Sequence, residues 1–333
     1  MPTSGTSTCS NPSDFESNFR HGRIDLVFAR WGEFKARLTW AEFGHLHLLR
    51  GDESLARIAY LSLAPERVFI GFPLHSNPPQ IWGGVKLQPS DIVLHAIGER
   101  MHQRTCAASR WGYISLPPKQ LAAYGRALVG VDLLAPPVAK ILRPPLAAKA
   151  ELLRLHAQTC RLAETKPDVI VHREVARALE QDMLVPLVNC LAVKDVQRVT
   201  DAKRHHARII VKFEDALAAH RERPLHIPDL CLAIGVSERD LRISCADILG
   251  MSPGRYLRLR RLNMVHTALR SPERAAASVA ETARRYGYSQ PKNFAASYRQ
   301  VFGETPSTTA YRSRGRDPDC PNLHRRPKRT FSP

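Results

Sequence analysis

The chain has 333 residues, of which 44% are hydrophobic and 24% are charged, and its formal net charge is +18. This length and apolar content are enough for two domains with buried cores. No apolar run approaches the roughly 18 residues of a membrane helix, so we expect no membrane partner. The charge is uneven: residues 201–333 hold 25 Lys and Arg against 13 Asp and Glu. A basic excess of this kind favours a phosphate-rich partner such as nucleic acid.

Seven cysteines are scattered along the chain, and no two of them form a Cys-x-x-Cys pair. An odd and widely spaced set is neither a disulfide framework nor a zinc finger, so it indicates reduced thiols and a cytoplasmic location. Residues 1–17 are rich in Ser and Thr and lack the apolar core of a signal peptide. We expect a flexible tail there.

Residues 18–135 contain short apolar runs separated by polar or Gly/Pro breaks, which is typical of a β-meander, barrel or jelly roll. The strand-like runs are residues 24–29, 37–49 with an interruption at Gly44, 54–63, 68–72, 81–87, 91–95 and 110–116. A small barrel can hold one small ligand among apolar walls and a few polar groups, although aromatic side chains more commonly fill the core. The candidate pocket residues are Trp40, His45, His47, Trp82, His95, Trp111 and Tyr113.

From Pro117 onward the apolar spacing becomes helical. Helices are expected over residues 119–129, 146–164 and 172–191, the last with a kink at Pro186. We assign residues 136–202 to a helical connector. A further helix over residues 204–220 leads into the C-terminal region.

Residues 203–312 contain one pattern written twice. Gly235 and Ser237 recur as Gly287 and Ser289 at an offset of 52, and Leu241, Gly250 and Pro253 recur as Phe294, Gly303 and Pro306 at an offset of 53. Each glycine suits a turn that needs positive φ, and each serine is a good N-cap for the following helix. The pattern predicts two helix-turn-helix motifs, joined by a long helix over residues 253–270.

The motif sequences resemble those of a known family. The residues that carry the resemblance are Gly-Val-Ser-Glu-Arg-Asp-Leu at 235–241, Leu-Gly-Met-Ser-Pro-Gly-Arg-Tyr-Leu at 249–257, Arg-Tyr-Gly-Tyr-Ser at 285–289 and Val-Phe-Gly-Glu-Thr-Pro-Ser at 301–307. They are similar to the AraC/XylS family of bacterial transcription regulators over about a hundred C-terminal residues.

The resemblance implies an α+β multidomain protein: a β-rich, cupin-like N-terminal sensor domain, a helical connector and an all-α double helix-turn-helix domain. It also implies a sequence-specific regulator, most commonly an activator, that responds to a small-molecule effector. The expected partners are double-stranded DNA, a second copy of the chain through the connector helices, and RNA polymerase. Packing within one chain explains the apolar connector stripe equally well.

Positions matching the family's DNA-binding residues lie at the start of each second helix and along the long helix. They are Ser237, Arg239, Arg242, Ile243, Arg255, Arg258, Ser289, Pro291, Lys292, Asn293, Ala295, Ala296 and Arg299. The family commonly has Arg where this chain has Ile243 and Ala296. Because the second motif has fewer hydrogen-bonding readers, we expect it to anchor the DNA backbone more than it selects sequence.

His45 and His47 resemble the His-x-His of metal-bearing cupins, but the carboxylate expected three or four residues later is replaced by Arg50 and Gly51. We therefore predict no metal, no cofactor and no enzymatic activity. Two alternatives stay open: a metal-dependent cupin enzyme fused to a DNA-binding domain, and an architectural DNA binder without an effector. Residues 313–333 are Pro-rich and basic, and they are expected to form a disordered tail.

Overall fold

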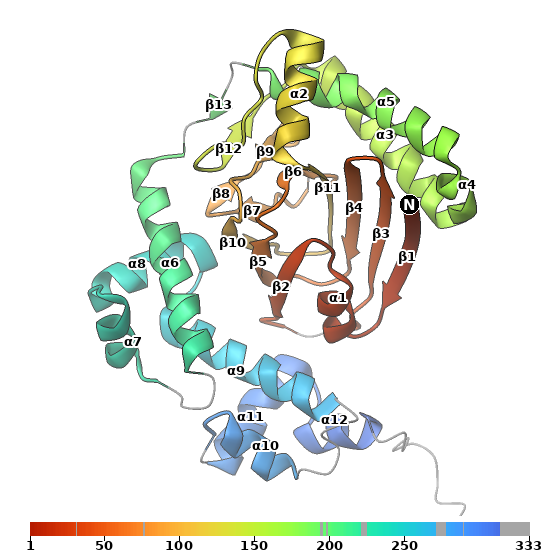
Figure 1. Cartoon of the computed structure of the whole chain (residues 1–333). Coiled ribbons are helices and arrows are strands. Elements are labelled where there is room, and N and C mark those ends of the chain that lie inside the picture. Colours follow the sequence, from red (N-terminus) through yellow and green to blue (C-terminus); the bar gives the residue numbers. More distant parts are fainter. Residues whose placement is uncertain are drawn as a thin grey trace, which may run out of the picture.

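The computed structural model describes residues 1–30, 32–75, 77–193, 196–197, 199–220, 225–270, 278–288 and 290–313. A β-rich N-terminal region is followed by a helical C-terminal region (Figure 1). Among the described helices, none has the length and apolar character to cross a bilayer. The expected basic tail, from residue 314 onward, lies outside the described residues.

The β-rich region consists of thirteen described strands in two antiparallel sheets. The strands are β1 (Thr3–Cys9), β2 (Gly22–Val27), β3 (Ala36–Phe43), β4 (Leu46–Glu53), β5 (Ile58–Leu63), β6 (Val68–Pro73), β7 (Ile81–Trp82), β8 (Val85–Lys86), β9 (Ile92–Leu94), β10 (Arg100–Arg104), β11 (Ser109–Leu116), β12 (Lys140–Leu142) and β13 (Val196–Gln197). The larger sheet has the order β1-β3-β4-β11-β6-β9-β12-β13, and the smaller has the order β2-β5-β10-β7-β8.

The two sheets share one apolar core, and we call this unit the β-sandwich. Alternate residues of β3, such as Leu38, point toward the smaller sheet, where they meet Ile24 of β2 and Leu61 of β5. The intervening residues, such as Ala41 of β3, point the other way. The strand period of two therefore gives the larger sheet two apolar faces, and both must be covered.

Helices cover the outer face of the larger sheet (Figure 1). The helices of this region are α1 (Pro12–Asn18), α2 (Pro118–Val129), α3 (Leu146–Thr165), α4 (Pro167–Val171) and α5 (Arg173–Leu191). Leu152 of α3 and Leu187 of α5 are fully buried against strand residues such as Ile114. Pro186 lies inside α5.

Two expectations about this region are wrong. Residues 3–9 are not part of a flexible tail but form β1, which pairs with β3 over seven residues. Backbone hydrogen bonds hold such an edge strand without an apolar run, and Thr suits an extended backbone. Residues 136–202 are not a separate connector, because β12 pairs with β9 and its helices pack on the sheet. They complete the same unit.

The C-terminal region contains the two predicted motifs. Its helices are α6 (Asp201–Ala219), α7 (Ile227–Ile234), α8 (Glu238–Leu249), α9 (Pro253–Arg270), α10 (Val279–Arg285), α11 (Pro291–Phe302) and α12 (Pro306–Ser313). The first motif is α7–α8, the second is α10–α11, and α9 joins them as expected (Figure 1). Apolar side chains from both motifs pack on α9 in one cluster, which includes Leu241, Leu262 and Phe294.

Both turn glycines adopt the left-handed conformation that the repeat predicted. Gly235 has φ 69° and Gly287 has φ 87°. The backbone N–H of Gly235 donates to the carbonyls of Cys231 and Leu232, which closes α7 before the chain turns into α8. A Cβ atom in this conformation is strained, which explains why glycine stands at both positions.

Replacing Gly235 by Ala should lower the free energy of unfolding by about 1 kcal/mol, because Ala at positive φ is strained even where space is free. A Cβ at Gly235 would have no neighbour within 4 Å, so steric overlap does not contribute. Gly254, which has equally open surroundings within α9, is the matched control. Gly254→Ala should stabilise by about 0.5 kcal/mol, since alanine favours a helix. Urea unfolding measures both values, and equal effects would contradict this account.

Candidate functional site

The N-terminal half of α8 presents a polar, exposed surface. Ser237 is the N-cap, and its hydroxyl accepts from the backbone N–H of Asp240 at 3.0 Å. Arg239, Arg242 and Ile243 are exposed, whereas Leu241 and other residues of the opposite face are buried. The helical period thus places these three predicted residues on the open side of α8.

The second motif exposes smaller side chains. Asn293, Ala295, Ala296 and Arg299 of α11 are exposed, and the Asn293 amide donates to Gln290 Oε1 at 2.6 Å. The N-cap position of α11 is occupied by Gln290 and has no side-chain cap. Ser289, which the sequence predicts as the cap of this helix, lies outside the described residues.

Three of the predicted DNA-binding positions lie wholly or partly outside the described structure. Ser289 lies outside the described residues, and so do the side chains of Pro291 and Lys292.

Helix α9 carries arginines of two kinds. Arg255 and Arg258 are exposed, whereas Arg260 pairs with buried Glu214 and Arg261 donates to the Leu225 carbonyl. The eighteen residues of α9 span roughly 27 Å at 1.5 Å per residue, a reach compatible with motifs set one turn of DNA apart. The exposed arginines of α8, α9 and α11 form no ion pair with any described residue. They are Arg239, Arg242, Arg255, Arg258 and Arg299.

Four of the predicted pocket residues fill the core of the β-sandwich. Trp82, His95, Trp111 and Tyr113 are at most 3% exposed, and the ring of Tyr113 lies 5.5–5.8 Å from the other three ring centroids. Their polar atoms mostly have internal partners; for example, Tyr113 accepts from the side-chain amide of Gln103. The structure brings these residues together, but as packed neighbours.

The other three lie nearer the surface. Trp40 is half-buried under the guanidinium of Arg20, which is 4.3 Å from the ring centroid. His45 lies in the turn after Gly44, outside the strand, so it does not share a strand face with His47. The interpretation of His45 and His47 as a His-x-His pair on one strand is therefore wrong, because His45 lies in the β3–β4 turn.

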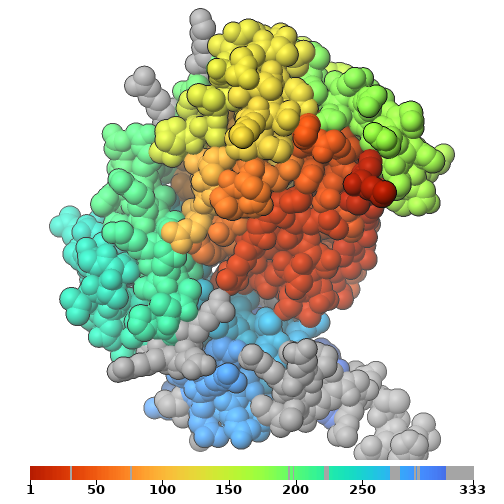
Figure 2. Space-filling view, in the orientation of Figure 1, coloured from red at the N-terminus to blue at the C-terminus, as the bar shows by residue number. Residues whose placement is uncertain are grey.

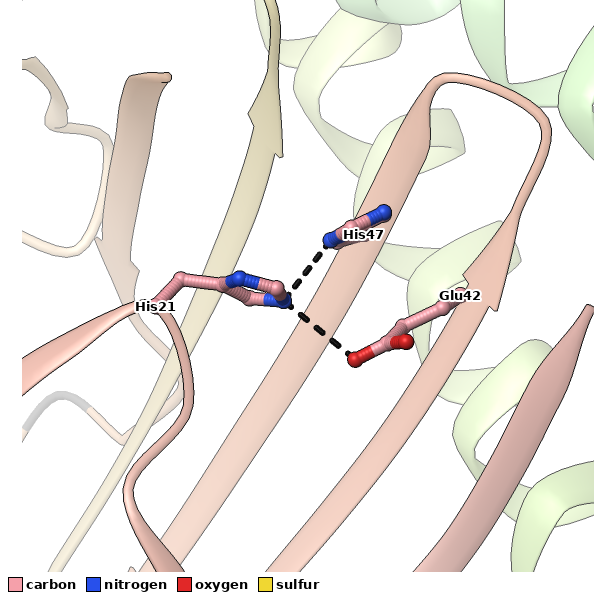
Figure 3. A group of neighbouring side chains, drawn as sticks. All are labelled: His21, Glu42 and His47. Carbon is pink, nitrogen blue, oxygen red and sulfur yellow. Dashed lines mark hydrogen bonds and ion pairs between the residues drawn. The ribbon is translucent and has the colours of Figure 1, made fainter. Parts of the chain in front are cut away.

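His47 instead lies beside His21 and Glu42 (Figure 3). Burial, together with the nearby Arg67 guanidinium and the His21 ring, lowers the pKa of His47 to about 4. The hydrogen bond with His21 lowers the pKa of Glu42 to about 2, despite partial burial. At neutral pH, His47 is therefore neutral and Glu42 is ionised. Sequence reasoning missed His21 and Glu42.

An open cavity of about 900 Å³ lies at one end of the β-sandwich, bordered by the ends of β1, β3 and β4. Its volume falls within the range of small-molecule sites. Basic and acidic residues line the cavity, and they include Lys35, Arg37, Arg50, Asp52, His75 and Arg110. None of the seven predicted pocket residues is among those that line it.

The β-sandwich contacts the C-terminal helices α6 and α9 through a buried carboxylate. Glu214 of α6 is fully buried and accepts from Tyr256 of α9 and from His102 of β10, the latter at 3.1 Å. Arg260 lies 3.2 Å from the second carboxylate oxygen. Burial raises the pKa of Glu214, but Arg260 and the two hydrogen bonds outweigh burial and hold the pKa below its usual range. Glu214 is therefore a buried anion shared by both regions.

Further contacts join the same two regions. The side chain of Asn263 on α9 forms two hydrogen bonds of 3.1 Å with the backbone of Phe28, just after β2. Lys203 of α6 donates to the Gly84 carbonyl of the β7–β8 turn and pairs with Asp247 of α8. These contacts involve α6, α9 and the C-terminal half of α8, and the C-terminal helices lie along one side of the β-sandwich (Figures 1 and 2). Residues of the N-terminal half of α8 stay exposed.

Known proteins resemble this chain in its C-terminal region. A family model described as a helix-turn-helix domain matches residues 230–312. The probable thc operon regulatory protein of Rhodococcus erythropolis is 31% identical over 140 residues, which cover 40% of this chain and 42% of that protein. The XylDLEGF operon transcriptional activator 3 of Pseudomonas putida is 38% identical over 105 residues, which cover 32% and 30%.

The crystal structure of the AraC-like transcriptional activator CuxR aligns over 78% of this chain and 94% of its own, with 14% identity and a TM-score of 0.40. The chain spans less than half the length of either curated relative. The matched residues 230–312 include both motifs and α9. They define a protein with a double helix-turn-helix domain. The helix-turn-helix match at residues 230–312 and the operon regulators among the relatives confirm the predicted resemblance to the AraC/XylS family.

Replacing Glu214 by Gln should destabilise the protein by about 3 kcal/mol, because Arg260 would remain largely buried without its counter-charge. Asp215→Asn is the matched control. Asp215 pairs with Arg100 at the surface, so its loss should cost less than about 1 kcal/mol. Urea unfolding of the full chain distinguishes the two variants. Similar small losses in both would show that Glu214 does not stabilise the contact.

Proposed function

We propose that this protein is a sequence-specific DNA-binding activator that responds to a small molecule through its cupin-like N-terminal region. It acts in the cytoplasm as a homodimer, in contact with RNA polymerase. One observation carries the proposal: each motif has an exposed surface on its second helix, and α9 joins the two motifs with a length compatible with binding in successive major grooves. The family relatives described as operon regulators and activators support the same conclusion.

In this proposal, α8 reads bases and α11 mainly holds the backbone. Arg239 and Arg242 are exposed near the start of α8, where a recognition helix meets base edges, and each can donate two hydrogen bonds to guanine. On α11 the exposed residues at matching positions include Ala295 and Ala296, which offer no donor. Asn293 is the described α11 side chain suited to adenine. Arg255, Arg258 and Arg299 neutralise phosphates.

The effector would act by binding one arrangement of the two regions more tightly than another. The 900 Å³ cavity supports a ligand site at the end of the β-sandwich, since the candidate residues in the core are packed against each other. The contact through Glu214 and Asn263 supplies a route by which the β-sandwich influences α9. Effector binding would therefore change how the motifs are held.

The two alternatives have less support. A fused metal enzyme was suggested by the His-x-His sequence, and that pair does not share a strand face. An architectural binder needs no base-reading side chains, whereas α8 exposes two unpaired arginines at the base-facing end. A regulator is the function that these residues favour.

Substitution of Arg242 tests the base-reading assignment. Binding sites are first selected from random DNA, and affinity is then measured for a selected site and for scrambled DNA. Arg242→Ala should weaken specific binding roughly 10- to 100-fold and should weaken nonspecific binding much less, because a base contact is lost.

Arg299→Ala is the matched control, since it removes the same side chain from an exposed position in the last turn of α11. It should weaken specific and nonspecific binding by similar factors and reduce the salt dependence of both. Equal losses of specificity in the two variants would reject the asymmetry. Failure to select any DNA sequence would reject the proposed function.

A further inference from the structure

His21, Glu42 and His47 meet at the edge of the β-sandwich interior (Figure 3). His21 Nε2 lies 2.7 Å from His47 Nδ1 and 3.2 Å from Glu42 Oε1, and one ligand atom from each residue lies within 4.8 Å of the other two. All three side chains are partly buried, and a cavity of about 10 Å³ borders them. We propose that this cluster binds a divalent transition-metal ion.

The β3–β4 hairpin brings two of the three ligands together. Gly44 has φ 55°, and the two residues Gly44 and His45 connect the strands, so that Phe43 opposes Leu46 and Glu42 opposes His47. Directly opposed residues of an antiparallel pair project to the same face at short Cβ separation. Glu42 and His47 therefore stand side by side because of the register, which also turns them toward the interior face of the larger sheet.

The third ligand is held by an unusual backbone conformation. His21 has φ 61°, the one positive φ at a non-glycine residue in the described chain. Strained backbone of this kind is concentrated at functional sites. The conformation lies just before β2, and it aims the imidazole at the pair on the hairpin (Figure 3).

The atomic separations suit a shared ion. Ligand atoms about 2.1 Å from one metal, at angles between octahedral and tetrahedral, are about 3.0–3.4 Å apart. The separation of 3.2 Å between His21 and Glu42 lies within that range, and the separation of 2.7 Å between His21 and His47 would reach it by a small side-chain movement. When the hydrogen of His21 is on Nε2, His47 and Glu42 both accept from it. A bound ion would take the place of this hydrogen between the three side chains, and His21 would then carry its hydrogen on Nδ1.

The ligand set favours an imidazole-preferring ion over a hard one. Thr3 donates to Glu42 Oε2 at 3.0 Å, which orients the carboxylate as outer-sphere partners of metal ligands do. Arg20 lies over Trp40 and donates to Glu42 Oε1 at 2.8 Å, so it would move aside when that oxygen binds an ion. Arg67 is held by hydrogen bonds to the carbonyls of His45 and Ser115. Both guanidinium groups repel any cation, so the choice of metal depends on the ligands, and Mg²⁺ and Ca²⁺ need several oxygen ligands. Two imidazoles and one carboxylate suit Zn²⁺ or Co²⁺.

Titration of the untagged full chain with Co²⁺ and Zn²⁺ tests the proposal without DNA. We expect one ion to bind per chain at this site. Calorimetry and the Co²⁺ absorption spectrum measure this binding. The metal should also raise the unfolding temperature, whereas Mg²⁺ should have no comparable effect. His21→Asn should weaken binding at least about tenfold, since loss of an outer-sphere partner alone costs that much. Asn tolerates positive φ, so this variant keeps the backbone.

His45→Ala is the matched control, because it removes a neighbouring histidine that is exposed in the β3–β4 turn. It should bind like the wild-type chain, and His47→Ala should bind as weakly as His21→Asn. Far-UV circular dichroism checks each fold, and Glu42→Gln replaces either variant if that variant fails to fold. Absence of binding by the wild-type chain, or unchanged binding by the ligand variants, would overturn the proposal. The proposed DNA-binding function would stand in either case.

Discussion

The position of the β-sandwich on the C-terminal helices depends on a buried negative charge. Glu214 lies where α6, α9 and β10 meet, and its carboxylate has Arg260, Tyr256 and His102 as partners. A buried carboxylate is costly unless it is fully paired. Separation of the two regions would remove the His102 contact and bring water to the others. A change in the β-sandwich that moves β10 therefore acts directly on the helices that carry the first motif.

Packing in the β-sandwich also decides where a ligand can bind. The larger sheet has two apolar faces, one covered by the smaller sheet and one by α3 and α5. Aromatic side chains such as Trp111 and Tyr113 fill the space between the sheets. Polar groups consequently gather at the edges of the sandwich. The large cavity and the group formed by His21, Glu42 and His47 both lie there.

Local patterns in the sequence predicted most of the secondary structure. The interruption at Gly44 marks the β3–β4 turn, and α9 has the predicted bounds. The missed strand β1 consists mainly of Ser, Thr and Gly. It has no apolar pattern to predict it, since an edge strand is held by backbone hydrogen bonds more than by apolar side chains. The missed strand β12 has three residues, too few for a period to appear. A turn at Gly44 was enough to predict that Glu42 pairs with His47 across the hairpin. His21 is too distant in sequence for any local rule to place it beside them.

The sequence by itself determined the double helix-turn-helix domain, because glycine turns, caps and helical spacing act between residues a few positions apart. The tertiary structure alone decided which side chains meet across the fold. Glu214 and His102 are 112 residues apart, and Asn263 and Phe28 are 235 apart. Such contacts depend on how sheets and helices pack together, and neither composition nor periodicity records that packing.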